Sequence, residues 1–311
     1  MGMANTVFAP KPQRVDSSLS ISRGHFTRPH LSQYRHRKFP STARVRAVDF
    51  IRPMAGRSQP WLLRCDDGCY YVVKFRNNPQ HTRILANELL CSRLAQLIGL
   101  PVAVPAVVLV PPGLLAGSRP PELTVGGRRE LCTAGLQFGS RYPGPPERTL
   151  VVDFLPDRLL SQVHNLVETF AGGFVFDKWT CNCDGRQAVF FRSVEDAGRP
   201  YTAQLIDHGC CFNGGEWSFP DSPIRSLYPR RLVYDTITSL ESFEPFLSSI
   251  ERLKPGHFAR CIADLPSEWC SPHAGELKPL VARLYARAKK LRQLILEARV
   301  TSRCFRNWVT T

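Results

Sequence analysis

The stretch Asp177-Lys178-Trp179-Thr180-Cys181-Asn182 holds a carboxylate and an amide at the spacing D-x-x-x-x-N. Residues 159–170 have helical apolar spacing, and we expect this helix to end at Gly172-Gly173. The stretch is then a loop just after a helix. There the aspartate can accept a hydroxyl proton and the asparagine can bind magnesium. The pattern alone is weak, since Asp and Asn are also common in ordinary turns.

A second carboxylate follows on the C-terminal side. Asp207 ends an expected strand at residues 202–206, which pairs with another expected strand at 187–191. Gly209 lets the chain turn sharply after it, so Asp207 is predicted to point into a cleft. The alternative is an ordinary Asp-x-Gly turn at a strand end.

An expected ion pair lies on the N-terminal side. Strands at residues 61–65 and 70–75 flank an Asp-Asp-Gly hairpin turn, and Lys74 stands near the end of the second strand. Glu88 lies on the apolar face of the helix that follows, where a carboxylate needs a partner. Lys74 is the candidate partner. A purely structural ion pair would give the same sequence pattern.

The remaining pattern predicts an α+β fold with two lobes. We expect a β-rich N-lobe over residues 47–154, a helical C-lobe over 155–311, and a cleft between them. The other expected elements are strands at 102–110 and 149–154, loops over 112–147, and helices at 243–253 and 278–300. In the last helix an apolar stripe is formed by Val281, Leu284, Ala288, Leu291 and Ile295.

Residues 1–46 lack hydrophobic periodicity and are predicted to be a disordered basic extension. An organelle transit peptide is the alternative for this segment. The net charge of +15 comes from this end and from residues 276–311. Basic ends of this kind attract nucleic acid in some proteins, but a solvated tail and a solvated helix face are the simpler interpretation.

Composition is that of a globular protein, with 311 residues, 43% hydrophobic and 22% charged. The sequence has no uninterrupted apolar run long enough to span a membrane and no signal peptide, so we expect a cytoplasmic protein. The eleven cysteines lack the spacing of zinc sites. Reduced, mostly buried thiols are therefore expected.

Taken together, these motifs resemble the HipA-like kinases, a branch of the protein-kinase-like superfamily that includes phosphatidylinositol and aminoglycoside kinases. The resemblance covers about residues 50–253. It is most specific in YYVVKFRNNPQH (70–81), ILANELL (84–90), FGSRYPG (138–144), FDKWTCNCDGRQAVF (176–190) and IDHGCCFN (206–213). It implies a two-lobed protein-kinase-like fold, with ATP between the lobes and magnesium at the phosphates.

The resemblance also assigns expected roles to the residues at the matching motif positions. Lys74 would contact the phosphates and Glu88 would hold Lys74. Asp177 would be the catalytic base, while Asn182 and Asp207 would bind the metal.

Two further segments would contact the nucleotide. Backbone groups of Asp153, Phe154 and Leu155 would form the hinge that meets the adenine. Ser58 and Gln59, between the first two strands, would lie over the phosphates.

The sequence departs from protein kinases at several motif positions. It has no G-x-G-x-x-G loop, Phe-Val-Phe precedes Asp177, and His208 replaces the Phe of D-F-G. Arg225, Arg230 and Arg231 would attract an acidic acceptor, or form a solvated surface. Arg141 is a further candidate phosphate contact.

The expected function is an ATP- and magnesium-dependent kinase that transfers the γ-phosphate to a hydroxyl of a protein or small molecule. One alternative is a pseudokinase that binds nucleotide without turnover and serves as a binding module. A less favoured alternative is a nucleic-acid-binding protein that uses its basic ends.

Overall fold

The computed structural model describes residues 42–309, apart from 118–119 and 197. Most of the basic extension predicted for residues 1–46 lies outside the described residues. Its last part was predicted wrongly, because residues 43–46 belong to the first strand, β1 (Ala43–Pro53). Residues 43–46 of β1 pair in parallel with β4 (Pro105–Val110), and residues 47–53 pair with the next strand along the chain.

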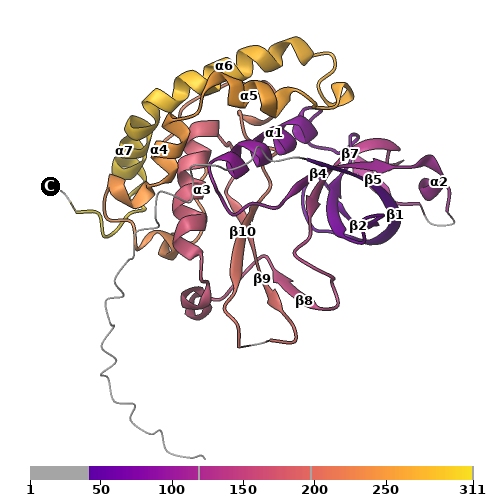
Figure 1. Cartoon of the computed structure of the whole chain (residues 1–311), viewed down its shortest axis with the longest axis horizontal. Coiled ribbons are helices and arrows are strands. Elements are labelled where there is room, and N and C mark those ends of the chain that lie inside the picture. The colour runs from indigo at the N-terminus through magenta and orange to yellow at the C-terminus, as the bar shows by residue number, and fades with distance from the viewer. Residues whose placement is uncertain (1–41, 118–119, 197, 310–311) are drawn as a thin grey trace, which may run out of the picture. The chain divides into compact units, whose positions relative to one another are not determined.

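Five strands form a closed barrel in the order β1-β2-β3-β7-β4 (Figure 1). The predicted hairpin is confirmed, with β2 (Trp61–Cys65) antiparallel to β3 (Tyr70–Lys74). Apolar side chains fill the interior, among them Val45, Leu63, Val73 and Val108.

The expectation of loops over residues 112–147 was wrong. This segment holds β7 (Gly135–Arg141), a central barrel strand that pairs with both β3 and β4. It also contains a short helix and a two-stranded ribbon: α2 (Pro112–Leu115), β5 (Glu122–Val125) and β6 (Arg128–Leu131). Glycine disfavours strands, but here it is required. A Cβ on Gly139 would lie 2.6 Å from Val108 Cγ2.

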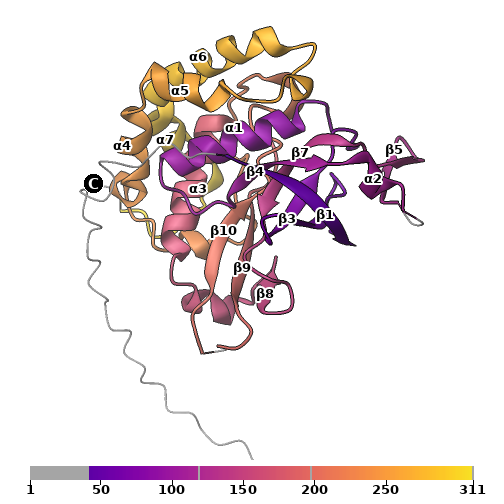
Figure 2. The ribbon, with the colours of Figure 1, turned by 45° about the vertical axis from the view of Figure 1, so that its right-hand side comes forward.

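Helix α1 (Ile84–Leu97) is almost completely buried, including its polar residues Asn87, Glu88 and Arg93. It packs against β4 and β7 on one side and against α5 (Pro255–Ile262) on another. Figure 2 shows it between the barrel and the C-terminal helices. Its polar groups therefore need partners inside the protein.

A second, antiparallel sheet has the order β10-β9-β8, with β8 (Thr149–Val152), β9 (Gln187–Ser193) and β10 (Thr202–Ile206). The predicted N-lobe ended at residue 154. Strand pairing places the change earlier, because β8 pairs with β9 and the chain leaves the barrel after Arg141. The connection between the two sheets is thus residues 142–148.

Helix α3 (Leu166–Thr180) runs through Gly172-Gly173 instead of ending there, as the sequence had suggested. Residues before it form a 3-10 turn, Asp157–Gln162. A Cβ on Gly172 would lie 2.4 Å from Leu100 Cδ2 and 2.7 Å from the Phe246 ring. These glycines allow close packing of the helix, and Asp177 consequently lies in its last turn.

The C-terminal helices form an arc over α3 (Figure 1). They are α4 (Phe246–Glu251), α5, α6 (Leu277–Arg287) and α7 (Leu291–Ser302). The predicted apolar stripe along residues 278–300 is confirmed as buried. Short 3-10 turns complete the fold: Gly214–Glu216, Arg231–Tyr234, Leu240–Phe243, Ser267–Trp269, Ala274–Glu276 and Ala288–Lys290.

All eleven cysteines lie in the described part of the chain and are free thiols. Most of them are buried, as predicted. Within the described residues, no helix combines the length and apolar character needed to cross a membrane.

Candidate active site

A buried lysine connects the barrel, α1 and the end of β10. Lys74 Nζ forms an ion pair with Glu88 Oε1 and donates a hydrogen bond of 2.9 Å to Asp207 Oδ1. The prediction that Lys74 and Glu88 pair is therefore confirmed in its geometry. Three segments far apart in the sequence meet at this point. They carry Lys74, Glu88 and Asp207, which are the first, second and last of the expected site residues.

Helix α1 also holds the chain directly after Asp207. Glu88 accepts hydrogen bonds from the main-chain N–H groups of His208 (3.0 Å) and Gly209 (3.1 Å). Asn87, which sequence reasoning missed, donates to the carbonyls of Gly209 and Cys211 and accepts from Trp217 Nε1. A buried asparagine beside a buried glutamate could have indicated such a role, because both need internal partners.

Electrostatics favour the charged forms of this cluster. Burial opposes the charge on Lys74, but Glu88 and Asp207 outweigh it and raise the pKa of Lys74 above its usual range. Burial alone would raise the pKa of Asp207. The charge and hydrogen bond of Lys74 outweigh that effect and hold the pKa of Asp207 at about 2.

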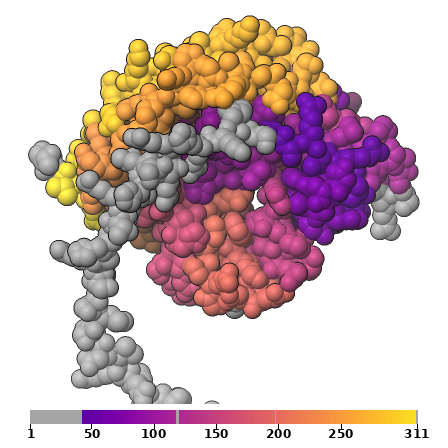
Figure 3. Space-filling view, in the orientation of Figure 1, coloured from indigo at the N-terminus to yellow at the C-terminus, as the bar shows by residue number. Residues whose placement is uncertain are grey.

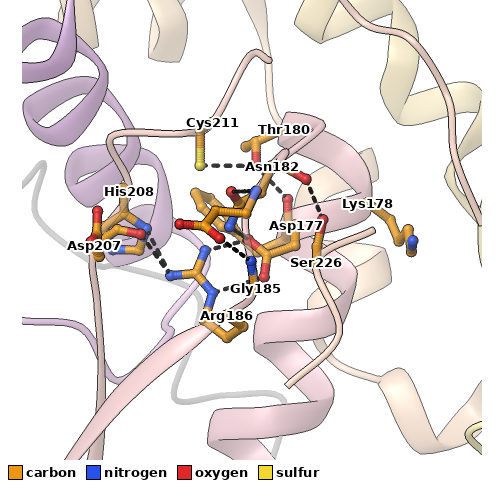
Figure 4. Close-up of polar contacts among 12 residues, drawn as sticks. Asp177, Lys178, Thr180, Asn182, Gly185, Arg186, Asp207, His208, Cys211 and Ser226 are labelled. Carbon is orange, nitrogen blue, oxygen red and sulfur yellow. Dashed lines mark hydrogen bonds and ion pairs between the residues drawn. The ribbon is translucent and has the colours of Figure 1, made fainter. Parts of the chain in front are cut away.

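Asp177 has a different environment from the one expected of a base. Its side chain is fully buried and forms a two-pronged ion pair with Arg186, with Nε 2.7 Å from Oδ2. Asn182 Nδ2 donates to Oδ1 of the same carboxylate at 3.1 Å. Figure 4 shows Asp177 between these two residues, with Lys178 directed away. Both oxygens of Asp177 are thus engaged inside the protein, an environment that disfavours its predicted role as a base.

Asn182 is likewise engaged at both ends of its amide. Its Oδ1 accepts a hydrogen bond of 3.1 Å from the main-chain N–H of Asp184, while its Nδ2 binds Asp177. The side chain is buried, with 1% of its surface exposed. This arrangement does not fit the predicted metal ligand. Asn182 instead fixes the loop that carries Asp184.

Asp184 and Gln187 are the site residues that sequence reasoning missed. Asp184 is half-buried, and Gln187 Nε2 donates to Asp207 Oδ2 at 3.1 Å. Arg186, between them, also donates to the carbonyl of Ile206 at 2.9 Å. An arginine at the start of an apolar strand was the available signal, since a buried guanidinium requires a carboxylate.

The loop between β1 and β2 lies at the Lys74 end of the barrel, because Trp61 pairs with Val73. Its two predicted phosphate contacts are not free side chains. Ser58 is buried, and the amide of Gln59 is bound to the main chain of Thr124, with both distances 2.8 Å. Gln59 thereby fixes the loop to the β5–β6 ribbon.

The predicted hinge, residues 153–155, follows β8 and not the barrel. Phe154 is 61% exposed, and the Arg230 guanidinium lies 4.8 Å from its ring centre. Arg230 also binds the carbonyl of Leu155 and the carboxylate of Asp157. The Leu155 carbonyl already has a partner, so this segment does not fit the hinge role, and Arg230 has a structural role.

The other candidate arginines are dispersed. Arg141 lies opposite Tyr71 on the neighbouring strand and donates to Cys69 Sγ at 2.9 Å, away from the Lys74 end. Arg225 and Arg231 are exposed, and Arg225 Nη1 donates to Asn213 Oδ1 at 3.1 Å.

The molecular surface is hollowed where the barrel meets the second sheet (Figure 3).

A mixed barrel with a buried lysine, a helix glutamate and a carboxylate after a paired strand defines a protein-kinase-like fold. The chain belongs to the HipA-like kinase family, whose model matches residues 48–297. The resemblance seen in the sequence is thereby confirmed.

The chain is also similar to solved kinase structures. It shares 13% identity with the proinflammatory kinase CtkA of Helicobacter pylori, covering 83% of this chain and 99% of that one, with a TM-score of 0.49. It shares 14% identity with a Golgi casein kinase, covering 85% and 75%, with a TM-score of 0.47. With the structure of the Golgi casein kinase that has Mn and ADP bound, the chain shares 14% identity. The match covers 88% of this chain and 77% of that one, with a TM-score of 0.44. No protein with a curated description matches the chain.

Proposed function

We propose that this protein is an ATP- and magnesium-dependent kinase that transfers the γ-phosphate to a hydroxyl of a protein or small molecule. The observation that carries the proposal is the buried Lys74 held between Glu88 and Asp207. In this proposal Lys74 contacts the phosphates, and Glu88 keeps its ammonium in position.

The residues around Asp207 fit a magnesium ion, because Mg²⁺ prefers oxygen ligands and is usually held by one or two carboxylates together with phosphates. Asp207 supplies a partly exposed carboxylate, and the Gln187 amide is hydrogen-bonded to it. We assign Asp207 and Gln187 to the metal in place of Asn182. Magnesium, when bound, neutralises charge that develops on the phosphate oxygens.

We assign the catalytic base to Asp184. It directly follows the loop fixed by Asn182, and it is half-buried where Asp177 is fully buried. A base must reach the hydroxyl proton of the acceptor. Asp184 would accept that proton as the oxygen of the hydroxyl attacks the γ-phosphate. Asp177 would position the loop through Arg186 and Asn182.

We also assign new contacts for the rest of the nucleotide. Residues 142–148 leave the barrel directly after β7, the strand that pairs with the Lys74 strand. Main-chain groups in this connection would meet the adenine in place of residues 153–155. Main-chain N–H groups of residues 56–58 would cover the phosphates, since the side chain of Ser58 is buried and the Gln59 amide is bound to Thr124.

The base assignment is tested by γ-phosphate transfer or ATP hydrolysis in Asp184→Asn. We expect turnover to fall by about 100-fold or more, while magnesium-dependent ATP binding is retained. Asp196→Asn is the matched control, because Asp196 lies in the loop at the other end of the β9–β10 hairpin and pairs with Arg199. Unchanged turnover in Asp184→Asn would contradict the assignment. ATP binding without any turnover in the wild type would favour the binding-module alternative.

A further inference from the structure

Two half-buried thiols face each other beside the candidate site. The side chains of Cys183 and Cys210 are close enough to interact with each other, and the main-chain N–H of Cys183 donates to the Cys210 carbonyl at 3.0 Å. Main chains joined in this way have Cα atoms roughly 5 Å apart. That separation lies within the range that a disulfide requires.

The two cysteines belong to the two segments that carry the candidate chemistry. Cys183 lies between Asn182 and Asp184, and Cys210 follows the Asp207-His208-Gly209 segment. Cys210 is close enough to Asp184 and Asp207 to interact electrostatically with both. A covalent bond between these thiols would therefore join the loop of the proposed base to the loop of the proposed metal ligand.

We propose that Cys183 and Cys210 form an oxidative modification site, at which a hydroperoxide converts the two thiols into a disulfide. The proposal rests on three observations: the paired side chains, the hydrogen-bonded main chains, and the partial exposure of both residues. Exposure matters because the oxidant has to reach a sulfur atom.

The proposed oxidation has two steps. The Cys183 thiolate attacks one oxygen of the hydroperoxide, the O–O bond breaks, and a sulfenic acid and an alkoxide or hydroxide ion are formed. The sulfur of the Cys210 thiol then attacks the sulfenic sulfur, the S–O bond breaks, and the oxygen leaves as water with the proton of that thiol. Two thiols are oxidised to one disulfide, and the hydroperoxide is reduced.

The chain contains an internal control for exposure. The side chains of Cys91 and Cys211 are also close enough to interact, but both are completely buried. Pairing alone would make both couples reactive. Pairing together with access selects Cys183–Cys210, so the buried couple should remain reduced under mild peroxide.

The test is mass-spectrometric mapping of disulfides after mild hydrogen peroxide treatment of the folded full chain. Cys210 and Cys211 are adjacent and share every peptide, so the variants Cys210→Ser and Cys211→Ala are needed to separate them. We expect a cross-linked peptide containing Cys183 in the wild type and in Cys211→Ala, and its loss in Cys210→Ser. Dithiothreitol should reverse the cross-link.

The proposal is overturned if Cys183 is oxidised without forming a cross-link. It is also overturned if the cross-link persists in Cys210→Ser, or if Cys91–Cys211 reacts at the same rate. The wild type and Cys211→Ala must show native circular dichroism. If Cys211→Ala does not fold, Cys211→Ser replaces it, because it also removes the second thiol of the shared peptide.

The effect of the disulfide on activity rests on the proposed function. We expect the oxidised protein to lose at least tenfold in magnesium–ATP affinity, and to recover after reduction. A cross-link without any change in ATP affinity would leave the modification site standing and refute its effect. Failure of the reduced protein to bind ATP would refute the kinase proposal, and the disulfide map would still decide the chemistry.

Discussion

Two aspartates on either side of Asn182 occupy opposite environments. Asp177 is fully buried and bound by Arg186 and Asn182, whereas Asp184 is half-buried in the loop that follows. A buried carboxylate with a guanidinium partner stabilises structure, and a more exposed one remains available for proton transfer. The D-x-x-x-x-N spacing drew attention to Asp177, but its burial could be known only from the fold.

The Asp177–Arg186 pair is expected to be structural. Asp177→Asn and Arg186→Met each leave a buried charged partner unpaired, and each should lower the free energy of unfolding by about 3–5 kcal/mol. The double variant should lose less than the sum of the two single losses. Urea unfolding of the four proteins measures this coupling.

The Asp157–Arg230 pair is the matched control, because Asp157 is 63% exposed. Asp157→Asn should lower the free energy of unfolding by no more than about 1 kcal/mol. A loss of that size in Asp177→Asn as well would contradict the structural role of Asp177.

The ion pair of Asp207 with Lys74 predicts a pH dependence of stability. The pKa of Asp207 is about 2 in the folded protein and 3.8 in a model compound, so the pair contributes fully above about pH 4. Without magnesium, the free energy of unfolding of the wild type at pH 6 should be about 2 kcal/mol higher than that of Asp207→Asn. This difference should shrink as the pH falls from 4 towards 2.

Denaturant unfolding of the two proteins between pH 7 and pH 3 measures this difference. The Lys74–Glu88 contact is present in both, so the comparison isolates Asp207. A difference that stays constant down to pH 3, or grows, would show that Asp207 is not held as an anion by Lys74.

At the scale of elements, glycine accounts for the main errors of sequence reasoning. Local pattern correctly predicted the β2–β3 hairpin, α1 and the β9–β10 pair. It assigned β7 to a loop and ended α3 too early because both contain glycine. In each case a close neighbour from a distant segment requires the missing Cβ, and that neighbour is known only from the fold.

Helix α3 offers a direct test of this explanation. Alanine is favoured over glycine in a helix by roughly 1 kcal/mol. Gly172→Ala should nevertheless destabilise the protein by about 1–3 kcal/mol, because its Cβ would overlap Leu100 and Phe246. Thermal and urea unfolding give the size of the loss.

Gly256 in α5 is the matched control, since a Cβ there meets no atom within 4 Å. Gly256→Ala should leave the stability unchanged or raise it. If Gly172→Ala were as stable as Gly256→Ala, close packing would not explain the glycine pair in α3.

On the scale of the whole molecule, α1 links the two parts of the fold. One continuous apolar core includes α1, β4, β7, α3 and the C-terminal helices. The sequence predicted a two-lobed kinase-like fold and the Lys74–Glu88 pair. The sequence could not locate the connection at 142–148. The strand β8 pairs with β9, and helix α3 separates these two strands along the chain.

Part of the basic C-terminal end is committed to internal contacts. Arg287 donates to the carbonyls of Lys178 and Trp179, Arg283 to that of Trp217, and Arg292 binds Glu251. Of these three arginines, Arg287 is buried, whereas Arg283 and Arg292 remain exposed. Part of the positive charge at this end of the chain therefore serves contacts within the protein.

Thermal unfolding with and without magnesium and ATP, on the wild type and Asp207→Ala, measures whether the protein has a nucleotide site that depends on Asp207. A ligand at about a hundred times its dissociation constant adds roughly 2.7 kcal/mol of stability. The wild type should show a magnesium-dependent rise in unfolding temperature that Asp207→Ala lacks. No shift in the wild type at millimolar ATP, or an equal shift in the variant, would contradict a nucleotide site built on Lys74, Glu88 and Asp207.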